Sequence, residues 1–230
     1  MIASKADIIA YESLGFSHLT YRGESYFVNL NSESSRSKFK NYLGKLTGKD
    51  WGIAELERCV FYRKDMYFLD RSNLRLNDTF QGKVDVPINT NSCAFMFFSK
   101  NLEGIDFSDF DTSGIEDMNS MFSYCTFPEG FSLGDKFDTS SVKDMGNMFC
   151  DASFNESFNL GDKFDTSNIK NMFGIFSGTQ FNEDFRLAKS FTICKESRDM
   201  FLDAKLPSRV AKQVSSEVIA KEIVELLKSV

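Results

Sequence analysis

The chain has 230 residues, 42% of them hydrophobic and 26% charged, and this composition excludes an intrinsically disordered chain and a collagen-like one. Asp and Glu number 33 against 27 Lys and Arg, and the whole acidic excess lies in residues 110–190, which carry 13 acidic and 6 basic residues. We therefore expect no direct binding of nucleic acid, whose phosphates attract basic surfaces, and we expect attraction to a partner with a basic surface.

The sequence predicts neither a membrane span nor secretion. Its longest apolar run, residues 94–98, is far shorter than the ~20 residues of a spanning helix. Residues 1–9 lack the apolar core of a secretion signal, so we expect a cytoplasmic protein, or a surface protein if an export signal has been removed. The wide spacing of the five cysteines excludes a Cys-x-x-Cys site and favours buried, reduced thiols; they are Cys59, Cys93, Cys125, Cys150 and Cys194.

Residues 1–87 are expected to form a mixed α/β domain that caps the segment after it. Apolar patterns predict helices at 5–14, 35–46 and 50–58, a strand at 25–30, and a hairpin that joins 60–62 to 66–69. Residues 44–50 look like a phosphate loop, but the glycine spacing is one residue short and Asp50 stands where Ser or Thr would hold magnesium. His18 is the only histidine and no serine lies in a nucleophile motif, so we expect no catalytic residue, no metal and no cofactor.

An internal repeat of 27 residues occupies the middle of the chain. Three consecutive units, 110–136, 137–163 and 164–190, are identical at ten positions. Four of these positions hold phenylalanine, which in the first unit are Phe110, Phe122, Phe127 and Phe131. Weaker units precede and follow the block, so we expect an array over about 88–206 with atypical capping repeats at its ends.

Each unit combines two patterns. Alternation of apolar and polar residues at 131–133 and 158–160 predicts a short strand. The Asp-Thr-Ser start predicts a cap and turn, and the spacing of Ile115, Met118, Met121 and Phe122 predicts a short helix. Such a coil buries its Phe and Met side chains only against neighbouring coils, so we expect an α/β repeat solenoid.

The repeat resembles a known family. Its pattern, Phe-Asp-Thr-Ser-x-[Ile/Val]-x-x-Met-x-x-[Met/Ile]-Phe, with Phe-Asn-Glu further on in two units, is similar to the BspA-like leucine-rich repeats of bacterial surface proteins. The resemblance is strongest over 110–190 and extends over about 88–206. It implies a leucine-rich-repeat-like solenoid of 27-residue coils that binds proteins or surfaces and catalyses no reaction. Members of that family are typically exported and anchored, whereas this sequence shows neither signal.

Residues 207–230 carry the apolar pattern of a helix whose phase changes near Ser215 and Ser216. Because the last coil of a solenoid has no neighbouring coil to bury its apolar side, we expect this C-terminal helix to cap that coil. The alternative is a helix that binds a partner. The expected domains are therefore an N-terminal domain at 1–87, the solenoid at 88–206 and the C-terminal helix at 207–230.

One acidic position recurs at the start of each unit, as Asp111, Asp138 and Asp165. We expect these side chains to cap the following turn by accepting backbone N–H groups, and the alternative is a column of carboxylates that binds cations. A complete calcium loop is excluded at Asp111, because Ser120 stands where a bidentate glutamate is needed.

Positions that differ between units are expected to be exposed. Phe173 replaces Asn119 and Gly146 of the other units, and it is either a binding hot spot or the seat of the C-terminal helix. We combine these variable positions with the surplus carboxylates into a predicted protein-binding surface, which consists of Asp117, Tyr124, Asp144, Asp151 and Phe173.

The leading functional hypothesis is a non-enzymatic protein-binding module whose acidic solenoid face engages a basic protein surface, such as that of a nucleic-acid-handling enzyme. The alternative is an inhibitor encoded by a mobile element such as a phage, which would imitate nucleic acid and block a host nuclease or defence complex. Two further hypotheses are a fragment of a surface adhesin and an enzyme within 1–87 that uses an unfamiliar site.

Overall fold

The computed structural model describes residues 7–11, 16–21, 24–29, 59–63, 66–70, 73–87, 90–155, 158–188 and 190–212, with side chains from residue 66 onward except that of Leu69. The helices expected at 35–46 and 50–58, the loop at 44–50 and most of the expected C-terminal helix lie outside these residues.

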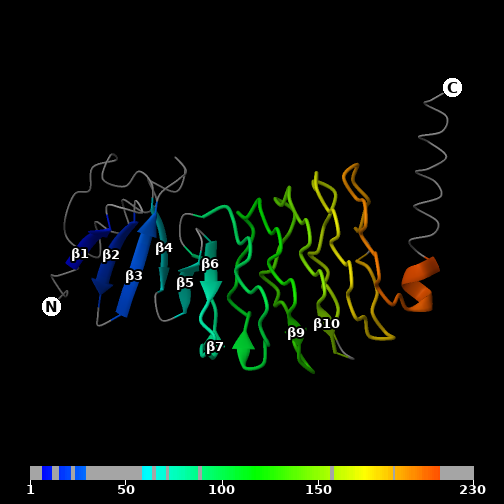
Figure 1. Ribbon diagram of the computed structural model, residues 1–230, viewed down its shortest axis with the longest axis horizontal. Helices are drawn as coiled ribbons and strands as arrows, with labels where there is room; N and C mark the ends of the chain where they lie inside the picture. The colour runs from blue at the N-terminus through cyan, green and yellow to red at the C-terminus, as the bar shows by residue number, and fades with distance from the viewer. Residues whose placement is uncertain are drawn as a thin grey trace.

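Four antiparallel strands form the first sheet (Figure 1). They are β1 (Asp7–Tyr11), β2 (Phe16–Tyr21), β3 (Glu24–Asn29) and β4 (Cys59–Arg63), paired in that order. The strand expected at 25–30 is confirmed by β3, but the helix expected at 5–14 is wrong, because β1 lies there and pairs with β2 over its whole length. The sequence Asp-Ile-Ile-Ala-Tyr of β1 is rich in β-branched and aromatic residues, which favour a strand once a partner strand supplies the hydrogen bonds.

The hairpin expected across residues 63–65 is wrong in its pairing. Both of its segments are strands, but β4 pairs with β3, whereas β5 (Tyr67–Asp70) pairs with β6 (Asn73–Leu76). The sequence pattern therefore located both strands but not their partners: β4 pairs with a strand about 30 residues earlier, and β5 pairs with the strand that directly follows it.

From residue 82 onward, successive stretches of chain lie beside one another in parallel (Figure 1). Strand β7 (Gly82–Lys83) pairs with β8 (Ile105–Asp106), and β9 (Thr126–Phe127) pairs with β10 (Ser153–Phe154). Parallel bridges continue the stacking at intervals of 25, 27, 27 and 25 residues; they link Ser92, Asp117, Asp144, Asn171 and Glu196. Equivalent residues of consecutive repeats are thus neighbours in space.

The helix expected from the spacing of Ile115, Met118 and Phe122 is wrong. Residues 119–124 form consecutive turns, with φ of +53° at Ser120 and +59° at Tyr124, values that a right-handed helix does not contain. Alternate N–H groups donate instead to the next repeat, as from Phe122 N to the Met148 carbonyl oxygen at 2.9 Å. The expected inward-facing residues are nevertheless buried, so the spacing identified the core side of the chain correctly.

The strands expected at 131–133 and 158–160 are also wrong. Residues 131–134 and 158–161 carry no regular structure, and the strands lie earlier in each unit, at β9 and β10. Side-chain burial nonetheless alternates along 131–133 as expected, since Leu133 is buried and Ser132 is exposed.

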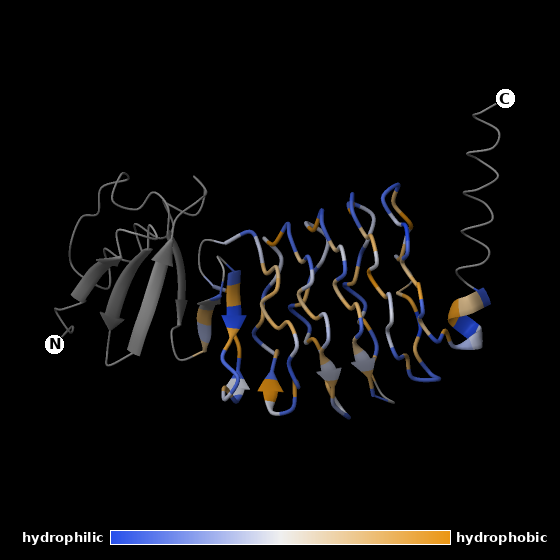
Figure 2. Ribbon diagram, in the orientation of Figure 1, coloured by the Kyte–Doolittle hydropathy of each residue, from blue (hydrophilic) through white to orange (hydrophobic). Residues whose placement is uncertain are grey.

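The core of the repeats is a set of stacked phenylalanines. Ten of the twelve repeat phenylalanines are buried, as expected, and Phe131 and Phe181 are partly buried. Figure 2 shows hydrophobic residues recurring along the successive stretches of chain. One column of near-parallel rings runs through five stretches of chain, with centroids 5.3, 5.7, 5.5 and 5.5 Å apart; its members are Phe97, Phe122, Phe149, Phe176 and Phe201. Such contacts form only between repeats, so each repeat depends on its neighbours for its buried area.

This core continues beyond the repeats on both sides. Met66, Tyr67, Leu76 and Val84 belong to the same buried cluster, so the core crosses residue 87, where we expected a domain boundary. At the other end, residues 208–212 are helical and place Val210 in that cluster. The remainder of the expected C-terminal helix lies outside the described residues.

Candidate functional site

The recurring aspartates at the start of the units cap turns. The Oδ1 atoms of Asp111, Asp138 and Asp165 accept hydrogen bonds from the N–H groups two residues later, at 3.1, 2.8 and 2.8 Å. These bonds favour the charged carboxylate: the Ser113 N–H lowers the pKa of Asp111, and the hydroxyl and N–H of Ser140 lower that of Asp138. Capping, which we expected, accounts for these carboxylates.

A buried threonine follows each of these aspartates and connects the repeats. The Thr112 hydroxyl donates to the Asp138 carbonyl oxygen at 2.7 Å and accepts from the Asp138 N–H at 2.8 Å. Thr139 makes the same two bonds to Asp165, each at 2.7 Å. The sequence marked this position as invariant, but the role of the hydroxyl emerged only when the repeats were stacked.

Asp117 and Asp144, two residues of the predicted binding surface, are half-buried and hydrogen-bonded within the stack. The Asp117 carboxylate accepts from the Ser92 hydroxyl at 2.8 Å and from the Asn119 N–H at 3.0 Å. That of Asp144 accepts from the Gly146 N–H at 2.8 Å and from the Asn171 amide at 3.1 Å. These contacts give both side chains a role in joining neighbouring repeats.

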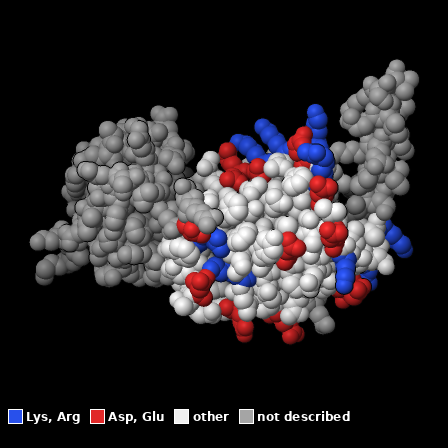
Figure 3. All heavy atoms as spheres, viewed as in Figure 1, with Lys and Arg blue, Asp and Glu red and all other residues white. Residues whose placement is uncertain are grey.

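Lysines stand among the carboxylates of the expected acidic solenoid face. Lys143 Nζ lies 2.8 Å from a Glu116 carboxylate oxygen, and both residues belong to the column immediately before Asp117 and Asp144. The Lys170 N–H donates to the Lys143 carbonyl oxygen, which places Lys170 next in the same column. Figure 3 shows basic and acidic side chains side by side along the upper edge of the stack.

The turn segments of the repeats together make a surface, which we call the turn surface; it comprises residues 94–99, 119–124, 146–151, 173–178 and 198–203. Each segment contains two residues with positive φ, four positions apart. At the second of these positions stand Ser99, Tyr124, Asp151, Gly178 and Asp203. Ser, Asp and Gly adopt this left-handed conformation readily, whereas a bulky aromatic residue does so rarely.

Tyr124 and Asp151, two more residues of the predicted binding surface, are brought together here. The Tyr124 side chain is 54% exposed, and its N–H donates to the Cys150 carbonyl oxygen at 2.8 Å, which places Asp151 beside Tyr124 in the next repeat. Interaction of the phenol with the Asp151 carboxylate raises the pKa of Tyr124. The ring packs against Phe98, with centroids 5.4 Å apart. On Phe98 lies the guanidinium carbon of Arg75, 4.8 Å from the ring centroid.

Two aromatic residues near Tyr124, which are Phe95 and Phe98, were not predicted from the sequence. Phe95 has φ of +59° at a position where the repeats carry Ser120 and Asn147, and its ring lies 5.8 Å from that of Phe98. The sequence contained a signal for this position. When the weak unit before residue 110 is aligned with the repeats, Phe95 stands where the repeats carry small polar residues.

Phe173, the last residue of the predicted binding surface, lies on the turn surface away from Tyr124. Its side chain is 39% exposed, and it makes no ring contact among the described residues. The described helical residues 208–212 leave it exposed.

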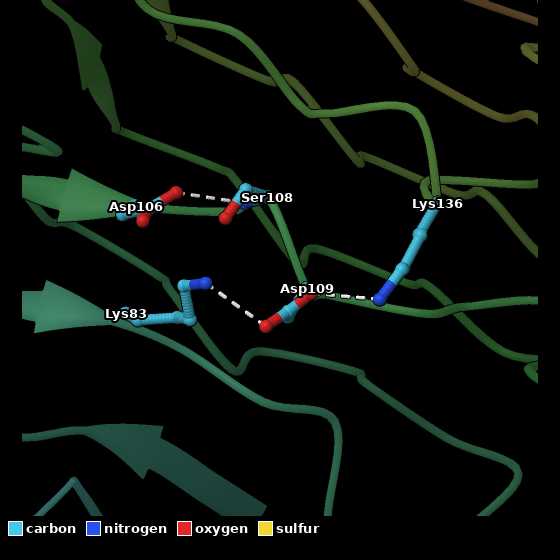
Figure 4. A network of polar contacts seen from close by, with 5 residues as sticks. All are labelled: Lys83, Asp106, Ser108, Asp109 and Lys136. Atoms are coloured by element: carbon cyan, nitrogen blue, oxygen red, sulfur yellow. Dashed lines mark hydrogen bonds and ion pairs between the residues drawn. The ribbon is translucent and has the colours of Figure 1, made fainter.

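A charged network joins the first repeat to its neighbours (Figure 4). The Asp109 carboxylate lies 2.9 Å from Lys83 Nζ and 2.7 Å from Lys136 Nζ. The hydrogen bond and charge of Lys136, followed by those of Lys83, lower the pKa of Asp109 to about 2. Asp106 accepts the Ser108 N–H beside it, as Figure 4 shows. This network tethers adjacent stretches of the stack at its surface.

Other acidic residues carry no ion pair within the described part of the chain. Glu129 and Glu183 stand at the same position of the first and third units and are exposed. Asp135 and Asp162 are exposed at the rim of an open cleft of about 470 Å³ between the first two units, with Lys163 beside them. These four exposed carboxylates are part of the acidic excess of the repeats.

Neither metal nor thiol chemistry is indicated in the described residues. No group of three His, Cys, Asp or Glu side chains with metal-binding geometry occurs among them. Cys93, Cys125 and Cys150 are free thiols, and burial raises the pKa of Cys125 to about 12 and that of Cys150 to about 11. Thiols held protonated in this way are poor nucleophiles. No helix in the described ranges is long and apolar enough to cross a membrane.

Comparison with known proteins places the stacked repeats in a family. Neither the curated proteins nor the solved structures gave a match. Residues 91–213, which are more than half of the chain and include all three repeats, match the family described as Mycoplasma protein of unknown function, DUF285. The chain belongs to the DUF285 family.

Proposed function

We propose that this chain is a non-enzymatic protein-binding module, that its repeats form a leucine-rich-repeat-like solenoid in which turns replace the expected helices, and that its acidic surface engages a basic surface of a partner protein. We further propose that it works in the cytoplasm, where free thiols such as those of Cys93 and Cys125 stay reduced.

One observation carries the proposal: exposed carboxylates without partners accumulate on the repeats. Glu129, Glu183, Asp135 and Asp162 have no ion pair among the described residues, whereas Asp109 and Glu116 are paired with lysines. Unpaired charge of one sign accelerates encounter with a surface of the opposite sign and selects against like-charged surfaces.

The mixed charge of the stack favours this function over imitation of nucleic acid. Imitation requires an uninterrupted row of carboxylates at roughly the spacing of phosphates. The column that contains Glu116 continues with Lys143 and Lys170. The next column contains the carboxylates of Asp117 and Asp144, which are half-buried. A basic patch on a partner protein, which does not require carboxylates at the spacing of phosphates, matches this pattern better than a nucleic-acid-binding groove does.

The proposal is tested by the salt dependence of association. A photo-cross-linking amino acid in place of Tyr124 would capture the partner, which would then be purified. We expect association with this partner to slow at least tenfold between low and high salt, because screening weakens attraction between charges more than ~8–10 Å apart. The double variant Glu129→Lys, Glu183→Lys should slow association at low salt.

The matched control is Ser132→Lys with Ser167→Lys, which adds two positive charges at exposed positions without removing carboxylates. It should slow association less than the glutamate reversals do. Equal on-rates at low and high salt would contradict the proposal, as would a fall in rate that is the same for both double variants.

A further inference from the structure

The feature that carries a further inference is the aromatic corner of the turn surface, formed by Phe95, Phe98 and Tyr124. Two of its three members stand in the left-handed conformation that the other turn segments fill with Ser, Asn, Asp or Gly. Folding of the stack therefore does not require aromatic residues there and is opposed by them. Tyr124 holds such a position with more than half of its surface exposed, and among the described residues its ring packs only against Phe98.

A carboxylate stands beside the exposed ring. Asp151 occupies the position of Tyr124 in the next repeat, and its carboxylate accepts a hydrogen bond from the Cys150 thiol at 3.2 Å. This donor is neutral, and no ion pair joins Asp151 to a Lys or Arg among the described residues. The negative charge of Asp151 is thus held at the edge of an aromatic ring without a cation to balance it.

The corner already holds one guanidinium. Arg75 places its guanidinium carbon 4.8 Å from the ring centroid of Phe98, and it donates a hydrogen bond to the Phe98 carbonyl oxygen. Phe98 also packs against Tyr124. The exposed Tyr124 ring therefore belongs to an aromatic cluster in which another ring already contacts a guanidinium. The distance places a guanidinium over one ring of this corner, that of Phe98.

We propose that Tyr124 and Asp151 form a binding site for an arginine side chain of a partner protein, with the guanidinium stacked on the Tyr124 ring and paired with the Asp151 carboxylate. This inference rests on the proposed function and names the residue that the partner contributes. Arginine fits better than lysine, because its planar guanidinium stacks on a ring and still donates hydrogen bonds in its plane to a carboxylate. Gly178, the next residue in the column, has no side chain, and the Asp151 carboxylate lies over it, where a Cβ atom would overlap Asp151 Oδ1.

The probe is a capped pentapeptide, Gly-Ser-Arg-Ser-Gly, compared with the same peptide carrying lysine or citrulline in place of arginine. Citrulline keeps the shape of arginine and lacks its charge. We expect saturable NMR shifts of the Tyr124 ring in the full chain with the arginine peptide. Binding should weaken about threefold with lysine and at least tenfold with citrulline.

Two variants separate the site from the fold. Asp151→Asn keeps a residue suited to positive φ and should weaken binding of the arginine peptide at least fivefold. Tyr124→Asn should abolish that binding while the melting temperature stays equal to or above that of the original chain, because asparagine occupies the equivalent kind of position at Asn147. Leu202→Ala, at another exposed apolar residue of the turn surface, serves as the control and should leave the binding unchanged.

The outcomes distinguish this site from the broader function. Binding of the arginine peptide that persists in folded Tyr124→Asn and Asp151→Asn variants, or that is equal for citrulline, overturns the arginine site. If association with the partner still depends on salt and on Glu129 and Glu183 in that case, the proposed function stands without this site. If the arginine peptide binds as expected but the rate of association with the partner does not change with salt, the acidic-surface function is overturned and the arginine site remains.

Discussion

Phe149 stands in the middle of the column of stacked rings, where both of its faces contact another ring. Phe122 lies 5.7 Å away on one side and Phe176 lies 5.5 Å away on the other, with interplanar angles of 7° and 5°. The side chain is fully buried. Neighbouring repeats are held by backbone hydrogen bonds on both sides, so they cannot move together to fill a gap at this position.

We predict that Phe149→Ala lowers the free energy of unfolding by ~3–5 kcal/mol, the range for loss of a buried phenylalanine from a core that cannot collapse. Chemical denaturation followed by circular dichroism measures this loss. Phe173→Ala, at a phenylalanine 39% exposed, is the matched control and should cost less than ~1 kcal/mol. Equal losses in the two variants would show that stacked rings do not hold the repeats together.

Asp109 shows how lysines from two neighbouring stretches of chain act on one exposed carboxylate. Its pKa falls from 3.8 to about 2, chiefly through Lys136 and then through Lys83. A lowered folded-state pKa means that the ion pairs stabilise the fold fully at pH values above 3.8 and lose that effect as the pH falls through about 2.

We predict that the carboxyl carbon of Asp109 titrates near pH 2 in carbon NMR at low salt. Lys136→Met should raise this midpoint toward 3.8, and Lys83→Met should raise it less, in the order of their influence on the carboxylate. Added salt should raise it as well, since all three side chains are exposed. A midpoint near 3.8 at low salt would mean that the network does not persist in solution.

At the scale of the element, the turn segments show how stacking decides backbone conformation. The apolar spacing of residues 115–122 is that of a helix, yet the segment forms turns whose alternate N–H groups donate to the next repeat. The remaining N–H groups close turns within the segment, as from Met121 N to the Met118 carbonyl oxygen at 3.2 Å. Every second hydrogen bond thus joins the segment to its neighbour, which an isolated helix does not allow.

Two equivalent glycines offer a matched test of how tightly the units approach each other. Gly134 and Gly161 lie at the same position of the first and second units, with φ of +77° and +82°. A Cβ atom on Gly134 would lie 2.8 Å from the Phe107 backbone oxygen, whereas one on Gly161 would meet nothing within 4 Å.

We predict that Gly161→Ala costs about 1 kcal/mol through its left-handed φ alone, and that Gly134→Ala costs at least about 1 kcal/mol more because the backbone of residues 107 and 108 must move. Thermal unfolding of the two variants measures the difference. Equal destabilisation would mean that the backbone at Phe107 yields without cost, contrary to the close approach seen here.

At the scale of the whole molecule, contacts between neighbouring repeats dominate. The Thr112 hydroxyl bonds Asp138 of the next unit, and Thr139 bonds Asp165 of the one after it. If the array is the solenoid that we propose, its units are interchangeable, because each contacts its nearest neighbours by the same set of residues.

We predict that deletion of residues 137–163, one whole unit, gives a folded protein with a lower free energy of unfolding and a smaller denaturant m-value, since less surface is exposed on unfolding. Deletion of residues 137–150, about half a unit, is the control and should abolish cooperative unfolding, because it shifts every later repeat out of register. A whole-unit deletion that fails to fold would contradict the solenoid.

The sequence by itself determined which residues face the core and where the repeats begin. Identity at Phe122, Phe149 and Phe176 requires that these side chains meet equivalent ones, and their burial confirms it. The Asp-Thr-Ser starts likewise predicted the turn caps at Asp111 and its equivalents, because an aspartate and the N–H two residues later interact locally. Local chemistry and periodicity are readable from one chain without knowledge of its folded neighbours.

Only the tertiary structure decided the backbone conformation and the composition of the surface. Hydrogen bonds between repeats turned an expected helix into turns, and partners far along the chain made a strand of the expected helix at 5–14. Tyr124 and Asp151, 27 residues apart, became neighbours. Lys143 came to lie beside Glu116, so the expected acidic face contains basic residues as well. These outcomes depend on which residues of successive repeats are stacked, and a strand or column acquires its partners only when the chain has folded.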